Sequence, residues 1–113
     1  MELVILDGQM AGTRFQLGGP VLTIGRRSDN DICLPLDPRI SRLHARLTHK
    51  SDETWIIEDL GSVNGTFVGQ RRINAPTALH LDDRFRMGRT WMTLQKPLQD
   101  AVQNEALQSI RLD

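Results

Sequence analysis

Three short segments of the chain carry polar side chains whose types and positions could do chemistry. Arg26 follows the run VLTIG, Ser41 and His44 stand within ISRLHARL, and Asn64 stands within GSVNGTFVG. A guanidinium, a hydroxyl, an imidazole and an amide can serve catalysis, the capture of an anion, or the closing of a loop onto a strand. The surrounding sequence has to decide among these three kinds of work.

Catalysis is the least favoured of the three. No serine or cysteine lies in a nucleophile elbow, no glycine-rich phosphate loop opens a helix, and His44, His49 and His80 lack the spacing of metal ligands. We therefore expect no enzyme, no catalytic residue, no metal and no cofactor. A histidine at the base of a strand is typical of a structural hydrogen-bonding group, and His44 is interpreted as a tie between two backbone segments.

The charge balance limits the partners. Fourteen Lys and Arg residues face fourteen Asp and Glu residues, so no long-range field draws the chain to nucleic acid or to an anionic membrane. Five arginines form what we call the basic rim: Arg26, Arg27, Arg39, Arg42 and Arg46. The rim is short and interleaved with aspartates, so it suits one phosphate better than a nucleic-acid polymer. The aromatic residues occupy apolar strand positions and are interpreted as core: Phe15, Phe67, Phe85, Trp55 and Trp91.

The cellular setting is predicted from cysteine usage and hydropathy. The single cysteine, Cys33, cannot form an internal disulfide and is interpreted as a small core residue, which favours a reducing, cytoplasmic setting. The start MELVILDGQM lacks the features of a secretion signal. Nowhere do eighteen apolar residues follow one another, so membrane insertion is not expected.

The elements that must position these side chains are short strands. Apolar runs recur between Gly, Pro, Asn and Asp clusters, which predicts an all-β sandwich or barrel. Strict alternation in LHARLT sends Leu43, Ala45 and Leu47 to the core and His44, Arg46 and Thr48 to the other face. Asn64-Gly65 between strand-like residues predicts a hairpin with a type I′ turn.

Residues 1–97 are predicted to form the folded domain, and the character of the chain changes after Pro97. Residues 98–113 are predicted to be a tail or linker with a helical pattern. Every fourth position carries an apolar residue, which gives one stripe: Leu98, Val102, Ala106 and Ile110. A helix of about sixteen residues is marginal alone, so the stripe docks on the sandwich, meets a partner, or frays.

In combination the segments resemble a known family, the forkhead-associated (FHA) domains, which are phosphothreonine-binding β-sandwiches. The matching blocks run in order from TIGRRSDNDICL through RISRLHARL and IEDLGSVNGTFVGQRRI to LHLDDRFRMG, so the resemblance covers nearly everything from Met1 to about Lys96. It implies two antiparallel sheets of about eleven strands, with a peptide bound by loops at one end of the sandwich.

The resemblance also implies roles for individual residues. Arg26 and Ser41 would hold the phosphate with Arg42 beside them, and Asn64 would grip the peptide backbone next to the phosphorylated residue. Three residues would support the site by shaping its loops: Gly25, His44 and Gly65.

Two positions set this chain apart. Family members often have threonine where this chain has Val63, so one phosphate contact is lost and weaker or altered binding is expected. Arg39 is expected to face residues that follow the phosphothreonine and to favour acidic ones.

The function implied is a phosphothreonine-dependent module that recruits phosphorylated partners in Ser/Thr kinase signalling. The alternative is a scaffold or oligomerisation domain that works without phosphorylation, through the sandwich surface or the tail at 98–113.

Overall fold

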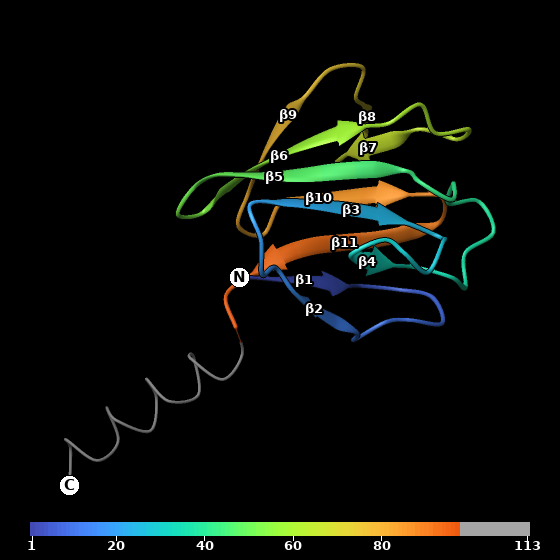
Figure 1. The fold of residues 1–113 in the computed structure, drawn as a ribbon, viewed down its shortest axis with the longest axis horizontal. Coiled ribbons are helices and arrows are strands. Elements are labelled where there is room, and N and C mark those ends of the chain that lie inside the picture. Colours follow the sequence, from blue (N-terminus) through green and yellow to red (C-terminus); the bar gives the residue numbers. More distant parts are fainter. Residues whose placement is uncertain (98–113) are drawn as a thin grey trace, which may run out of the picture.

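The computed structural model describes residues 1–97, which form a sandwich of two sheets (Figure 1). The six-stranded sheet has the order β2-β1-β11-β10-β7-β8, and the five-stranded sheet has the order β4-β3-β5-β6-β9. The strands are β1 (Glu2–Ile5), β2 (Arg14–Gln16), β3 (Val21–Gly25), β4 (Ile32–Cys33), β5 (Ala45–Ser51), β6 (Thr54–Asp59), β7 (Thr66–Val68), β8 (Arg71–Arg72), β9 (Thr77–His80), β10 (Arg84–Met87) and β11 (Thr90–Gln95).

The predicted all-β sandwich of about eleven strands is therefore confirmed, with one refinement. Every neighbouring pair is antiparallel except β3 and β4, which run parallel. The predicted helical tail lies outside the described residues. Among residues 1–97, there is no helix long and apolar enough to cross a membrane.

The core lies between the two sheets and follows the two-residue period of the strands. In β5 and β6, Leu47 pairs with Ile57 and both are fully buried. In the other sheet, Phe85 pairs with Met92 and both are again fully buried. Burying side chains of this size stabilises the fold by about 1.5–3 kcal/mol each.

Two expectations about which side chains face the core are wrong. Leu43 is 41% exposed whereas His44 is completely buried, because β5 begins only at Ala45 and the alternation does not extend back to residue 43. Phe67 and Trp91 are only partly buried and lie on the outer face of the six-stranded sheet. Phe85 and Trp55 are buried and Phe15 packs against the core, as expected.

The sheets bring distant loops to one end of the sandwich. Ile24 pairs with Ala45, and Ala45 pairs with Asp59, so the end of β3, the start of β5 and the end of β6 lie side by side. The loops that leave these strands gather at the end away from the N-terminus (Figure 1). The residues expected to form the site are on these loops.

Candidate functional site

Three loops meet at Ser41: the loop after β3, the loop before β5 and the loop after β6. The backbone amide of Arg26 donates to the carbonyl oxygen of Ser41 at 3.0 Å, and the backbone amide of Val63 donates to its hydroxyl oxygen at 3.0 Å. Because the Ser41 Oγ already accepts a hydrogen bond, its own proton is directed elsewhere. The Ser41 hydroxyl is thus oriented as a donor at a partly buried position.

His44 connects the Ser41 segment to the loop that carries Gly65. Its ring is completely buried, its Nδ1 accepts the backbone amide of Ser41 at 3.0 Å, and its Nε2 lies 2.9 Å from the carbonyl oxygen of Gly65. Since Nδ1 accepts, Nε2 carries the proton and donates to Gly65. Burial lowers the pKa of His44 below its ordinary value of 6.5 despite the hydrogen bond to Gly65, so the ring is neutral.

Arg26 is anchored at one atom only. It is partly buried, and its Nε donates to the carbonyl oxygen of Ile40 at 3.0 Å. Within residues 1–97, its two terminal nitrogens donate to no protein acceptor. The guanidinium is therefore fixed in place beside the Ser41 segment while most of its donors remain available.

Gly25 and Asn30 fix the Arg42 segment beside Arg26. A methyl group on Gly25 would lie 2.1 Å from the carbonyl oxygen of Arg42, so only glycine allows the two backbones to approach this closely. That same oxygen accepts the side-chain amide of Asn30 at 2.7 Å and the backbone amide of Arg27 at 3.2 Å. In the described part of the chain, the backbone amide of Arg42 makes no hydrogen bond and can serve as a further donor.

Asn64 lies exposed at the rim and bridges two loops. Its Nδ2 donates to the carbonyl oxygen of Arg39 at 2.8 Å, which leaves its Oδ1 and a second N–H for other partners. The predicted type I′ hairpin is wrong. Gly65 has a φ of +88°, but Asn64 does not have a positive φ, and the flanking strands β6 and β7 belong to different sheets.

The loop that carries Asn64 is built on Asp59. This carboxylate accepts the backbone amides of Gly61 and Ser62, both at 3.0 Å, and the hydroxyl of Thr66 at 2.7 Å. Burial tends to raise the pKa of Asp59, but the hydrogen bonds from Ser62 and Thr66 outweigh it and hold the pKa below the ordinary 3.8. From the sequence Asp59 was assigned no role in the site, although an Asp two residues before a Gly is a recognisable signal for such a turn.

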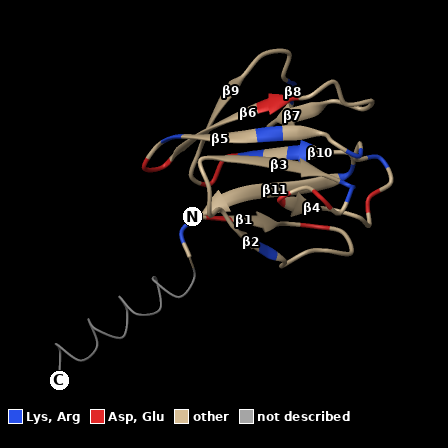
Figure 2. Cartoon of the chain, viewed as in Figure 1, with Lys and Arg blue, Asp and Glu red and all other residues tan. Residues whose placement is uncertain are grey.

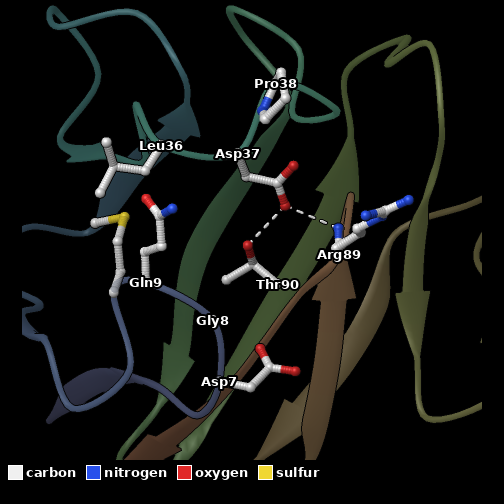
Figure 3. Close-up of a pocket in the computed structure, with 9 residues that line it drawn as sticks. Asp7, Gly8, Gln9, Leu36, Asp37, Pro38, Arg89 and Thr90 are labelled. Carbon is white, nitrogen blue, oxygen red and sulfur yellow. Dashed lines mark hydrogen bonds between the residues drawn. The ribbon is translucent and has the colours of Figure 1, made fainter.

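Asp37 ties the Arg39 segment to a distant turn. Its carboxylate accepts the backbone amides of Arg39 at 2.9 Å and Arg89 at 2.8 Å, and the hydroxyl of Thr90 at 2.7 Å; Figure 3 shows the last two. Burial opposes ionisation of Asp37, yet the hydrogen bond from Thr90, with those from the two amides, lowers its pKa below 3.8. Beside it lies a hollow of about 290 Å³, bordered also by Leu36 and Pro38.

Basic and acidic residues both occur on the strands and loops of the sandwich (Figure 2). Of the predicted basic rim, two arginines have acidic neighbours: Arg27 pairs with Asp29 at 2.6 Å, and Arg46 pairs with Glu58. Arg26, Arg39 and Arg42 form no ion pair among the described residues. Val63 is 83% exposed beside them, and its side chain offers no hydrogen bond.

Comparison with known proteins assigns the chain to a family. A model of the FHA domain matches residues 22–88. The FHA domain-containing protein FhaB of Mycolicibacterium smegmatis is 36% identical over 94 residues, which cover 83% of this chain and 59% of that protein. The glycogen accumulation regulator GarA of the same organism is 36% identical over 72% of this chain and 50% of its own length. The chain thus spans about half to three fifths of the curated relatives it matches.

Solved structures agree with this assignment. The FHA domain of the CT664 protein from Chlamydia trachomatis superposes with a TM-score of 0.77 at 32% identity, covering 85% of this chain and 96% of that one. EmbR of Mycobacterium tuberculosis, solved in complex with a low-affinity phosphopeptide, gives 0.73 at 31% identity over 83% of this chain and 24% of its own. The chain therefore belongs to the FHA domain family.

Proposed function

We propose that the protein is a phosphothreonine-dependent binding module that recruits phosphorylated partners in Ser/Thr kinase signalling. The observation that carries this proposal is the set of unused donors at the meeting point of the three loops. The terminal nitrogens of Arg26, the oriented hydroxyl of Ser41 and the backbone amide of Arg42 lie on segments that are hydrogen-bonded to one another.

These groups match the chemistry of a phosphothreonine. Its phosphate carries nearly two negative charges at pH 7 and three acceptor oxygens, so a receptor needs charged and neutral donors fixed in different directions. The guanidinium of Arg26 supplies the charge, and the hydroxyl of Ser41 and the amide of Arg42 supply directed donors. Because His44 and Gly25 hold these segments in place, little ordering has to occur on binding.

Asn64 would recognise the peptide backbone. After its bond to Arg39 it still has one acceptor and one donor, which match the N–H and C=O of an extended peptide. The side chain of Arg39 would favour acidic residues after the phosphothreonine. Val63, which has no hydroxyl, would make phosphate binding weaker than a threonine would at this position.

Relatives support the proposal. EmbR has been solved with a phosphopeptide, and the FhaA FHA domain, 29% identical to this chain, has been solved in complex with the intracellular domain of Rv3910. A phosphorylated protein partner and a cytoplasmic location are part of the proposal for this chain.

An oriented phosphopeptide library tests the proposed function. Each phosphothreonine peptide is titrated alongside its unphosphorylated twin and a glutamate mimic, and the phosphorylated form should bind much more tightly than either. Binding should also weaken as the pH falls through about 6, where the phosphate loses its second charge. Equal affinity of the phosphorylated and unphosphorylated forms across the library would refute the proposal.

A further inference from the structure

Four side chains form a row across the outer face of the six-stranded sheet. Arg72 pairs with Phe67, Phe67 pairs with Arg86, and Arg86 pairs with Trp91, so one residue from each of β8, β7, β10 and β11 stands in line. Paired residues share a face of a sheet. The strand neighbours of Arg86 are fully buried, so the row faces outward. We call these four residues the arginine–aromatic row.

The row is held together by its own contacts. The guanidinium carbon of Arg86 lies 4.1 Å from the ring centre of Phe67 and 5.7 Å from that of Trp91. Its Nη1 also donates to the carbonyl oxygen of Gly88 at 2.6 Å. Arg86 is therefore a fixed cation between two aromatic rings, and no carboxylate of residues 1–97 pairs with it.

Arg72 connects the row to the loop that carries Asn64. A methyl group on Gly65 would lie 2.5 Å from Nε of Arg72 and 2.8 Å from its guanidinium carbon, so this guanidinium packs directly on the backbone next to Asn64. Arg72 is exposed, and its side chain has no hydrogen bond or ion pair within residues 1–97. A partner bound at Asn64 would meet this charge next.

The same face carries a further free cation. Arg84 is two residues from Arg86 on β10 and so projects from the same side; it is exposed and unpaired in the described part of the chain. It borders, with Trp91 and Gly69, a hollow of about 350 Å³. Two acidic residues lie near this face. Glu2 on β1 is paired with Arg14 at 2.9 Å, and Asp7, which also borders the hollow, accepts the backbone amide of Trp91 at 2.9 Å.

We propose that the arginine–aromatic row and Arg84 form an auxiliary surface for an acidic segment of the phosphorylated partner, a segment that continues past the phosphothreonine. This inference rests on the proposed function and extends it. Strands lie about 4.8 Å apart, so the row spans about 14 Å, which roughly four or five residues of extended peptide can cover. Acidic residues a few positions from the phosphothreonine would pair with Arg72 and Arg84.

An acidic peptide fits this surface better than single-stranded nucleic acid. Bases stack on open aromatic faces, but here the guanidinium of Arg86 already covers the ring of Phe67. The chain as a whole has zero net charge and so has no general attraction for a polyanion. A peptide with a short run of carboxylates needs only two or three cations to pair with, and this face offers Arg72, Arg84 and Arg86.

The test compares a short phosphothreonine peptide with versions extended by three or four glutamates on either side. One extension should tighten binding to the wild type by about five- to tenfold at low salt, and the gain should shrink at high salt. In the double variant Arg72→Glu/Arg84→Glu the gain should vanish, and in the single variant Arg84→Glu the gain should shrink while the affinity for the short peptide stays within about twofold. Arg71→Glu is the matched control: Arg71 is equally exposed and adjacent to Arg72 but points away from the row, so the gain should persist.

NMR of the side-chain N–H groups provides a second readout. The extended peptide should shift the indole signal of Trp91 and the Nε–H signal of Arg84, and the short peptide should leave both unchanged. The inference is overturned if neither extension tightens binding, if the gain survives the double variant, or if a single-stranded oligonucleotide displaces the extension at lower concentration than free glutamate peptide does. If the short phosphopeptide itself fails to bind, the proposed function fails. The auxiliary surface is then tested separately with the glutamate extension alone at high concentration. This peptide must shift the indole signal of Trp91 in the wild type but not in the double variant; otherwise the surface is refuted as well.

Discussion

Replacing His44 by phenylalanine tests the physical basis of the site most sharply. The ring volume is roughly kept, but the Ser41 amide and the Gly65 carbonyl lose their shared partner, a ring that is completely buried. Each unsatisfied buried group costs about 1–3 kcal/mol. We therefore expect His44→Phe to lower the free energy of unfolding by about 2–5 kcal/mol.

Urea denaturation at pH 7.5 measures this loss, with the slope of the transition used to check that the folded and unfolded states are otherwise alike. His80→Phe is the matched control, because His80 is exposed and should change stability by less than about 0.5 kcal/mol. His44→Phe should also weaken phosphopeptide binding at a temperature where the variant is folded, since Ser41 is no longer held. A loss below about 1 kcal/mol would refute the view that His44 ties the two loops together.

The pH dependence gives an independent check on His44. Its pKa in the folded protein is below 6.5, so between pH 6.5 and that lower value the unfolded chain binds the proton and the folded chain does not. Stability should therefore fall as the pH drops below 6.5, by at most about 1.4 kcal/mol per pH unit from this residue. The wild type should show this slope and His44→Phe should lack it; parallel curves for the two proteins would contradict a buried neutral ring.

Three further substitutions have expected outcomes. Gly25→Ala forces a methyl group against the Arg42 carbonyl and should cost about 1–3 kcal/mol of stability together with phosphopeptide affinity; an unchanged melting transition and affinity would count against the close approach. Asp59→Asn should cost about 2–4 kcal/mol at pH 7, and the difference from wild type in a denaturation series should disappear as the pH falls through the folded pKa of Asp59, below 3.8. Val63→Thr should leave stability within about 0.5 kcal/mol and tighten phosphopeptide binding by about three- to tenfold in a calorimetric titration; no gain would show that the missing hydroxyl is not what limits binding.

Much of the fold could be predicted from local signals. Gly, Asn and Asp clusters mark the turns, and apolar runs of strand length lie between them, so an all-β sandwich followed from the sequence. The convergence of the loops also followed, because loops at one end of a sandwich meet. Arg26 illustrates this convergence. Strand β3 ends at Gly25, so the side chain of Arg26 is free to reach the Ser41 segment.

The errors arose where backbone contacts between distant segments override the local pattern. His44 is buried and Leu43 is exposed because the backbone of His44 donates to Ile24 and accepts from Leu60, which turns its side chain under the loops before β5 begins. Alternation alone cannot reveal such contacts. The attachment of Asp37 to Thr90 spans 53 positions and is equally invisible in the sequence.

The predictions that Phe67 and Trp91 lie in the core were wrong for a related reason. Phe67 sits in a strand of only three residues, and the pairing of β7 with β10 decides its face. Trp91 lies on the same side of β11 as Thr93 and Gln95, opposite the buried Met92 and Leu94. The outward direction of Phe67 and Trp91 is what places Arg86 between two rings. Two residues predicted to lie in the core thus belong to an exposed surface of the six-stranded sheet.

Calorimetric titration of one phosphothreonine peptide against the wild type, Arg26→Ala and Arg27→Ala tests the central claim most directly. Arg27 is the control, because it is an exposed neighbour whose charge is already paired with Asp29. Loss of the Arg26 guanidinium should cost about 2–5 kcal/mol of binding, roughly 30-fold or more in affinity, while Arg27→Ala changes affinity by only a few fold. Equal affinities of the wild type and Arg26→Ala for the phosphopeptide would contradict the account.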